Sequence, residues 1–226
     1  MSVFETLSPE QQALIKKHLD LVIEYNKVIN LTRIDTVENG MILHAEDSLI
    51  GLDELNEAPD GLYGDLGSGA GYPGIPLAIA SGRKTVLIDA RKKKMEAMED
   101  VINKLGLSEQ IGVYAGRAEL LARKQSKRYA ALTARALSQL SVLMELASPL
   151  LQTDGLLICY KAQLTDEEFD AALHIQNLVG MKHEKSRNLM LDGKYQRQIL
   201  TFRKYAEPKV RLPRQEGQAQ KQPLVS

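Results

Sequence analysis

The spacing of apolar residues along the chain changes at about residue 60. Before that point, apolar residues at positions 14, 15, 19, 22, 23 and 29 recur at roughly helical spacing. The stretch Ser8-Pro9-Glu10-Gln11 has the N-cap serine, first-turn proline and capping-box glutamine of a helix start. A second helix is predicted over about residues 36–55, so residues 1–60 are expected to form a small helical appendage.

From residue 61 onward, short apolar runs alternate with amphipathic stretches that predict helices, one of which spans about 91–105 and stops at Gly106. This alternation predicts an α/β fold over residues 61–206, with a mostly parallel seven-stranded sheet covered by helices on both faces. Residues 207–226 are rich in proline, glutamine and charge and are expected to form a basic extended or disordered tail. The predicted strands are 61–66, 85–89, 111–114, 129–134, 156–160, a weak run at about 181–191, and 196–204.

Composition narrows the class of protein. No apolar run approaches the ~18 residues that span a bilayer, and the polar start shows no secretory signal. Cys159 is the only cysteine, which rules out an intrachain disulfide and fits a reducing cytoplasm. The four histidines have no metal-ligand spacing, so no metal site is expected.

Charge is balanced overall but not along the chain. Residues 1–60 hold 4 basic and 12 acidic residues, whereas residues 61–226 hold 25 basic and 17 acidic residues. Either one face of the protein attracts polyanions, or folding interleaves the two signs.

The segment GDLGSGAGYPGIP, residues 64–76, follows the first predicted strand and contains five glycines. In sheets of this kind a ligand lies beyond the carboxyl end of the strand, and glycines let it approach the backbone. The helix after this segment presents free N–H groups to such a ligand. The segment therefore predicts a ligand-binding loop.

Two classes of ligand fit this loop. Starting at Gly69, it satisfies the GxGxxG pattern of dinucleotide-binding proteins, although no continuous apolar strand leads into that glycine. Starting at Asp65, it resembles the DxGxGxG loop of S-adenosylmethionine-dependent methyltransferases. Asp89 follows Gly67 by 22 residues and is placed to accept both ribose hydroxyls of an adenosine, which either ligand contains. Asp89 is also expected to act as the N-cap of the helix at 91–105.

Seven segments together carry a family resemblance: GDLGSGAGYPGIPLAIA, YNKVINLTRI (25–34), HAEDSL (44–49), GRAE (116–119), ARALSQL (134–140), Lys161 and the ending PRQEGQAQKQPL (213–224). In these segments the chain resembles the ribosomal RNA small subunit methyltransferase G family, also called glucose-inhibited division protein B. The resemblance covers nearly the whole chain. It departs from the family at Ala162, where members often have glycine after the lysine, and in a slightly short spacing between GRAE and ARAL.

The resemblance implies a Rossmann-like class I S-adenosylmethionine-dependent methyltransferase with the helical appendage. Its expected reaction is methyl transfer to N7 of a guanosine in the helix 18 loop of 16S rRNA, as free RNA or within an immature small subunit. We expect a cytoplasmic monomer without metal. Cofactor contacts are expected from Asp65, Gly67, Ser68, Gly69, Gly71, Tyr72, Asp89, Ala90, Arg91, Ala118, Glu119 and Arg135.

The residues at the end of the fourth predicted strand agree with this expected chemistry. Guanine N7 has a free lone pair and carries no proton, so its methylation needs positioning rather than a general base. The sequence has Thr133-Ala-Arg-Ala here, not the Asp/Asn-Pro-Pro-aromatic run of amino-nitrogen methyltransferases, and Cys159 lies inside an apolar strand. On the substrate side, Arg135, His44, Asn30 and Lys161 are candidates, although each also has an ordinary structural explanation.

Two basic segments are candidate RNA contacts. Arg91-Lys92-Lys93-Lys94 lies in the first turn of a predicted helix, where cations oppose the helix dipole; a solvated face is the alternative. The tail from Arg203 has six basic and two acidic residues. Three other functions stay open at this point: methylation of a small molecule, a nicotinamide-dependent oxidoreductase, and a non-catalytic RNA-binding assembly factor.

Overall fold

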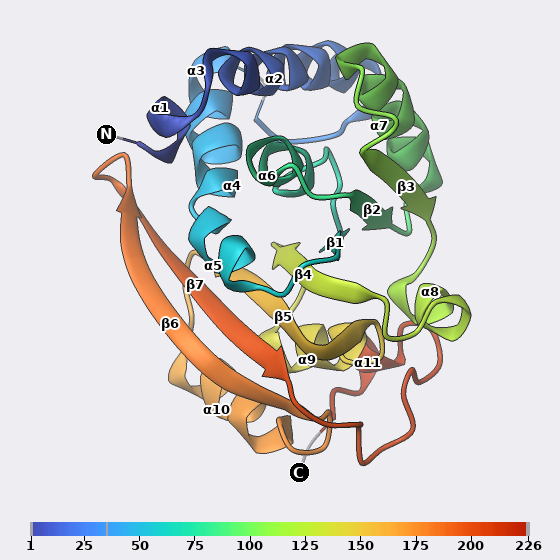
Figure 1. The fold of residues 1–226 in the computed structure, drawn as a ribbon. Helices are drawn as coiled ribbons and strands as arrows, with labels where there is room; N and C mark the ends of the chain where they lie inside the picture. The colour runs from blue at the N-terminus through green and yellow to red at the C-terminus, as the bar shows by residue number, and fades with distance from the viewer. Residues whose placement is uncertain (1, 35, 225–226) are drawn as a thin grey trace.

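The computed structural model describes residues 2–34 and 36–224 of the chain (Figure 1). Its centre is the predicted seven-stranded sheet, and the strand order is β3-β2-β1-β4-β5-β7-β6. β7 runs antiparallel to both of its neighbours, and the other strands are parallel to one another. The strands are β1 (Leu62–Leu66), β2 (Thr85–Asp89), β3 (Ile111–Ala115), β4 (Tyr129–Arg135), β5 (Leu151–Lys161), β6 (Met181–Leu191) and β7 (Tyr195–Lys204).

Helices cover both faces of the sheet (Figure 1): α2, α6 and α7 pack on one side, and α8 to α11 lie on the other. Within the described residues, no helix is long and apolar enough to cross a membrane. The helices are α1 (Val3–Thr6), α2 (Pro9–Ile29), α3 (Val37–Gly40), the π-helical segment η1 (Met41–Glu46), α4 (Asp47–Leu49), α5 (Leu52–Glu57), α6 (Gly74–Ser81), α7 (Lys92–Leu105), α8 (Ala118–Lys124), α9 (Leu140–Ala147), α10 (Asp166–Ile175) and α11 (Gln218–Lys221).

The start of α2 confirms the predicted capping box. Ser8 Oγ accepts a hydrogen bond from Gln11 N at 3.2 Å, and Gln11 Oε1 accepts one from Ser8 N at 3.0 Å. Gln11 also donates through Nε2 to the carbonyl of Ile79 in α6. The N-terminal helices therefore pack directly on the sheet-covering helices, and the domain boundaries at residues 60 and 206 stay predictions.

The prediction of one helix over residues 36–55 was wrong. The segment is divided into α3, η1, α4 and α5, and a π-helical stretch at residues 41–46 interrupts the regular turn. Two glycines explain part of the path: a Cβ on Gly40 would collide with the Leu19 side chain, and one on Gly51 would collide with the Tyr160 ring. Tertiary contacts, rather than an uninterrupted helical period, therefore determine the backbone path of this segment.

The end of the chain is more ordered than the predicted extended or disordered tail. Gln218–Lys221 form α11, and Ala219 is buried against α9. Arg214 makes a bidentate ion pair with the buried carboxylate of Glu145, with N–O distances of 2.7 and 2.5 Å. These contacts order the segment against α9, which is distant from it in the sequence. Residues 225–226 of the predicted tail lie outside the described residues.

Candidate active site

The glycine-rich segment forms the turn from β1 into α6. Gly67, Gly69 and Gly71 have positive φ angles of 71°, 55° and 84°, a region that side chains disfavour. Gly67 N donates to the carbonyl of Ile88 at 2.7 Å, which ties the turn to the end of β2. The glycines therefore have a conformational reason as well as the predicted steric one.

Asp65 lies under this loop and not on the surface of the cavity that the loop borders. Its Oδ2 accepts from Gly74 N at 2.9 Å, and its Oδ1 accepts from Thr133 Oγ1 at 2.7 Å. Burial raises the pKa of the Asp65 carboxyl to about 7, against the opposing effect of these two hydrogen bonds. Asp65 therefore joins β1, β4 and the start of α6 and holds the loop from below.

A cavity of about 680 Å³ opens above the loop, at the carboxyl ends of the parallel strands. It brings together most of the residues predicted from sequence. Asp65, Gly71, Asn30 and Lys161 do not line it; Asn30 is exposed and ends α2 in the left-handed conformation. The predicted residues that do line it are Gly67, Ser68, Gly69, Tyr72, Asp89, Ala90, Arg91, Ala118, Glu119, Arg135 and His44.

Asp89 stands at the end of β2 on one side of this cavity. Its Oδ2 accepts from Gly69 N at 3.0 Å and its Oδ1 from Arg91 N at 2.8 Å. The prediction that Asp89 is the N-cap of α7 was wrong: Arg91 occupies that position, without a side-chain cap. Since a carboxylate oxygen accepts more than one hydrogen bond, both oxygens keep capacity for hydroxyl donors of a ligand.

The start of α8 forms the next wall, and the C-terminal segment completes it. Glu119 is buried and accepts from the backbone N–H of Gly217 at 2.8 Å. Gln220, on α11, lines the cavity beside Ala118. Sequence reasoning missed Gln220, although the ending that contains it carries part of the family resemblance.

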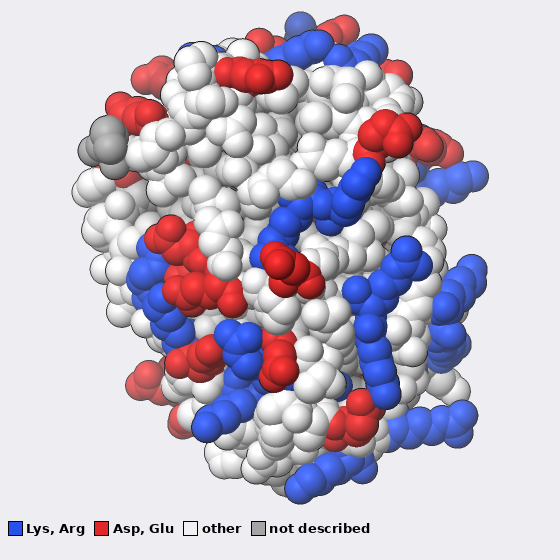
Figure 2. Space-filling model, viewed as in Figure 1, with Lys and Arg blue, Asp and Glu red and all other residues white. Residues whose placement is uncertain are grey.

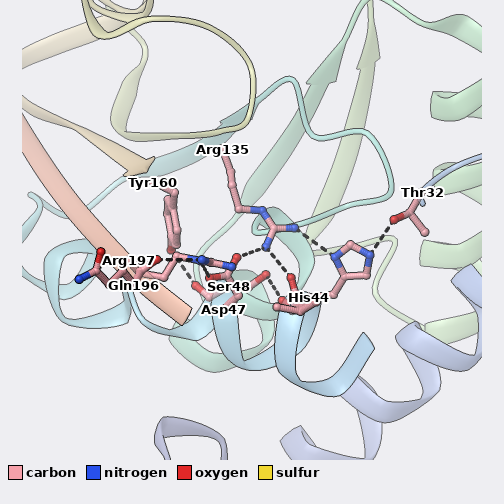
Figure 3. Close-up of polar contacts among 9 residues, drawn as sticks. Thr32, His44, Asp47, Ser48, Arg135, Tyr160, Gln196 and Arg197 are labelled. Atoms are coloured by element: carbon pink, nitrogen blue, oxygen red, sulfur yellow. Dashed lines mark hydrogen bonds and ion pairs between the residues drawn. The ribbon is translucent and has the colours of Figure 1, made fainter. Parts of the chain in front are cut away.

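On the opposite side, Tyr72, His44 and Arg135 form a packed wall. The rings of His44 and Tyr72 are stacked, with centroids 4.4 Å apart and planes 7° apart, and the Arg135 guanidinium lies 5.8 Å from the Tyr72 centroid. His44 Nδ1 faces Arg135 Nη2 at 3.4 Å, and His44 Nε2 lies 2.8 Å from Thr32 Oγ1 (Figure 3). Because arginine only donates, Nδ1 is the acceptor, and the proton of the neutral ring lies on Nε2.

A second histidine supports this wall from below. His18, in α2, is fully buried; its Nε2–H donates to the carbonyl of Ala70 at 3.1 Å, and its ring centroid lies 4.4 Å from that of Tyr72. Burial lowers the pKa of both His18 and His44 to about 3, and at His44 the Arg135 charge adds to the effect. Both rings are therefore neutral at physiological pH.

A smaller cavity of about 410 Å³ adjoins the first and shares His44, Arg135 and Ala136 with it. Lys161 lines this second cavity, where its Nζ is held by the carbonyl of Ser138 at 2.9 Å and by Glu168 at 2.5 Å. Arg197 and Asp47 also line it, and neither was predicted as a site residue. Asp47 belongs to the HAEDSL segment, which was the available signal; Arg197 had none.

Among the described residues, no group of three or more histidine, cysteine, aspartate or glutamate side chains is arranged to hold a metal ion. Cys159 is fully buried in the core, as predicted, and burial raises its pKa to about 12. The polar groups at the first cavity include backbone N–H groups, the carboxylates of Asp89 and Glu119, and the Arg135–His44 pair.

Comparison with solved structures shows the fold. The precorrin-6y C5,15-methyltransferase of Geobacter metallireducens superposes with a TM-score of 0.54 at 12% identity, over 78% of this chain and 92% of that one. A geranyl diphosphate methyltransferase superposes with a TM-score of 0.54 at 12% identity, over 70% and 85%. Together with the strand order, these likenesses show a Rossmann-like class I methyltransferase fold.

Comparison of sequences is more specific. The family profile described as rRNA small subunit methyltransferase G matches residues 11–200. The ribosomal RNA small subunit methyltransferase G of Limosilactobacillus reuteri is 33% identical over 97% of this chain and 93% of its own length. The protein of that name from Bacillus pumilus is 30% identical over 97% and 93%. The chain therefore belongs to the rRNA small subunit methyltransferase G family.

Proposed function

We propose that the protein transfers the methyl group of S-adenosylmethionine to N7 of a guanosine in the helix 18 loop of 16S rRNA. The observation that carries the proposal is the composition of the first cavity. A glycine cradle and Asp89 lie on one side, and a cationic wall at Arg135 lies on the other. Membership of the family supports an RNA acceptor over a small molecule, and a methyltransferase over a nicotinamide-dependent oxidoreductase.

The residues present fit this cofactor. A Cβ on Gly67 would collide with the Leu137 side chain, and at Gly69 the left-handed backbone leaves the space beside the loop open. Asp89 would accept the ribose hydroxyls, while Ala118 and Glu119 would flank the adenine. When bound, the cofactor supplies an activated methyl group on a sulfonium sulfur. The loop would hold that end of the molecule toward Arg135.

The groups around the cavity suit an acceptor that loses no proton. Among the described lining residues, Asp89 and Glu119 are held by backbone N–H groups, and His44 accepts from Arg135. Guanine N7 needs no base, because its lone pair forms the new C–N bond as the C–S bond breaks and the positive charge passes to the base. What the chain must supply is orientation of the two reactants.

We propose that the enzyme acts as a monomer in the cytoplasm. N7 faces the major groove, which is deep and narrow in A-form RNA. The target guanosine must therefore be unpaired or transiently exposed when it enters the site.

The direct test is methyl transfer from labelled S-adenosylmethionine to 16S rRNA that lacks the modification. We expect incorporation, with a single strand cleavage in the helix 18 loop after chemistry specific for N7-methylguanosine. We also expect at least about tenfold lower activity when the same loop is sealed in a duplex, since a few kcal/mol are needed to unpair a base. Cleavage elsewhere, or equal activity on the duplex, would contradict the proposal.

The basic run at the start of α7 is an accessible candidate RNA contact. Lys92 and Lys93 are exposed, and they border a groove with Val28, which is 86% exposed at the end of α2. Lys94 instead donates to the carbonyl of Leu31 at 2.7 Å. Figure 2 shows basic side chains gathered along the side where α7, β3 and α8 lie in Figure 1.

Reversing the charge of Lys92 and Lys93 together, to glutamate, is expected to weaken RNA binding. It should also lower the slope of log affinity against log salt by about 0.7 for each phosphate that the protein no longer neutralises. Filter binding at several salt concentrations measures both effects. Lys16→Glu is the control, because Lys16 lies on α2 about 18 Å from Val28 along the helix axis, at a rise of 1.5 Å per residue. It is therefore distant from the groove that Lys92 and Lys93 border. Equal reductions in the control and the double variant would exclude this surface.

A further inference from the structure

The second cavity is formed by segments far apart in the sequence. Asp47 comes from the start of α4, Arg135 from the end of β4 and Arg197 from β7. Asp47 Oδ2 accepts from Arg135 Nη1 at 2.8 Å, and Asp47 Oδ1 accepts from Arg197 Nε at 2.5 Å (Figure 3). The cavity adjoins the glycine-loop cavity through Arg135, so a ligand filling both would pass this guanidinium.

This cluster is cationic and mostly shielded from water. The side chains of Arg135 and Arg197 are 15% and 16% exposed, and that of Asp47 is 6% exposed. One carboxylate faces two guanidinium groups, which leaves one positive charge in excess within the trio. Lys161, on the same cavity, is neutralised by Glu168. Hydrogen bonds made here are stronger than in bulk water because the local dielectric constant is low.

Some donors of the arginine pair are not used within the protein. Arg197 donates hydrogen bonds from Nε to Asp47 and from Nη1 to the carbonyl of Gln196. Arg135 donates from Nη1 to Asp47 and to the carbonyl of Leu43, and from Nη2 to His44. Arg197 Nη2 and Arg135 Nε therefore have no protein acceptor among the described residues, which leaves them for a ligand.

We propose that the second cavity is the pocket for the acceptor guanine, and that Arg135 and Arg197 donate to its O6. The inference rests on the proposed function, because it takes the acceptor to be a guanosine. O6 is next to N7 on the same edge of the base. A guanine with N7 directed at the glycine-loop cavity thus presents O6 near the junction of the two cavities, which Arg135 borders from both sides and Arg197 from the side of the second cavity.

The geometry favours a base over a phosphate in this pocket. The cavity of about 410 Å³ is in the size range of small-molecule sites, and the ring of buried Tyr160 forms part of its wall. A backbone phosphate carries its charge on several oxygens and offers no flat ring to stack on an aromatic wall. Arg135, in contrast, is mostly buried and lies beside the ring of Tyr72, which is stacked on His44.

Asp47 acts in this pocket as a positioning residue. It is the shared acceptor of both arginines, which would otherwise repel each other, and it sets the direction of their remaining donors. Ser48, its neighbour, accepts through its backbone carbonyl from Tyr160 Oη at 2.7 Å, so the same turn also places the aromatic wall (Figure 3).

The test pairs a change in the protein with a change in the RNA. In unmodified 16S rRNA, ligation replaces the target guanosine with 2-aminopurine riboside, which keeps N7 and lacks O6. We expect this replacement, and Arg197→Gln on normal RNA, each to lower kcat/KM for RNA about tenfold or more. Arg197→Gln tested on the 2-aminopurine RNA should lower kcat/KM little more than either change alone, because both changes remove the same interaction. The Kd for S-adenosylmethionine should stay within about twofold.

Arg187→Gln is the matched control. Arg187 lies on β6 in a bidentate pair with buried Glu54, outside both cavities. It should lower thermal stability and leave the response to 2-aminopurine at the wild-type value.

If Arg197→Gln and the O6 deletion act additively, the contact is absent and the inference is wrong. If the wild-type enzyme does not methylate the guanosine in normal RNA, the proposed function fails instead.

Asp47→Asn tests positioning. We expect kcat/KM for RNA to fall about tenfold while the Kd for S-adenosylmethionine is kept, and Asp47→Glu to recover part of the loss because it restores the charge. A purely structural Asp47 would change the cofactor Kd and the RNA parameters together, and its replacement would leave the wild-type response to O6 deletion intact. That pattern would overturn the positioning role.

Discussion

Asp89→Ala is expected to weaken binding of S-adenosylmethionine by about a hundredfold or more. In the proposed complex each Asp89 oxygen accepts a ribose hydroxyl, and hydrogen bonds to a charged group are worth about 1.5–3 kcal/mol each. Asp89 also anchors the loop through Gly69 N at 3.0 Å and Arg91 N at 2.8 Å, so its replacement removes preorganisation as well. Isothermal titration calorimetry with S-adenosylmethionine measures the change.

Asp100→Asn controls for loss of a carboxylate from the same region. Asp100 is half-exposed on α7 and pairs with Lys104 at 3.1 Å, outside the cavity. It should leave the cofactor Kd within about twofold, because exposed helix pairs contribute only ~0.3–0.5 kcal/mol. An Asp89→Ala variant that is folded and binds the cofactor like wild type would show that Asp89 serves the loop alone.

Unfolding stability is expected to depend steeply on pH between about 4 and 6, because His18 and His44 are buried in neutral form with pKa values lowered to about 3. In the unfolded chain both would take up protons as the pH falls below about 6.5. The unfolded state then binds more protons than the folded one, so stability is full above about 6.5 and is lost as the pH falls. Each histidine contributes a slope of about 1.4 kcal/mol per pH unit.

Asp65 opposes this trend. Its pKa is raised to about 7, so the folded state keeps a proton that the unfolded state releases above about pH 4. Its contribution to stability is therefore lost as the pH rises toward and through about 7. The slope of the wild-type protein is the sum of these opposing effects, so the effect of one histidine must be measured as a difference between variants.

His18→Gln isolates the contribution of His18, since the glutamine amide can still donate to the carbonyl of Ala70. We expect the slope of unfolding free energy against pH to fall by about 1.4 kcal/mol per pH unit between about pH 4 and 6. Urea denaturation at a series of pH values measures it. His174→Gln, at an exposed position on α10, should leave the slope unchanged. Equal slopes in wild type and His18→Gln would mean that His18 is protonated in the fold.

Local patterns predicted a large part of the architecture. The seven strands, the capping box of α2 and the end of α7 at Gly106 each depend on residues within a few positions of one another. Period, caps and turn residues act over that range, so they can be read without knowing the fold. The glycine loop and Asp89 belong to the same class, because a turn after a strand and a carboxylate after the next strand meet at one edge of a parallel sheet.

Where local pattern and packing disagreed, packing decided. The apolar positions at 36–55 suggested one helix, but the segment forms α3, η1, α4 and α5, with Gly40 packed against Leu19 and Gly51 against Tyr160. The polar, proline-containing ending was predicted to be extended or disordered, yet Arg214 forms an ion pair with the buried carboxylate of Glu145, 69 residues away. Asp65 was expected at the ligand, and the structure turns it under the loop.

The sequence alone determined that the chain forms an α/β fold with a mostly parallel sheet, a glycine-rich ligand loop and a carboxylate beside it. Only the tertiary structure brought Asp47 to Arg135 and Arg197, which are 88 and 150 residues away, and placed His18 beneath Tyr72. Such contacts depend on the docking of whole helices and strands. No spacing along the chain encodes them, because a residue's distant neighbours are chosen by the shape and burial of the elements that carry them.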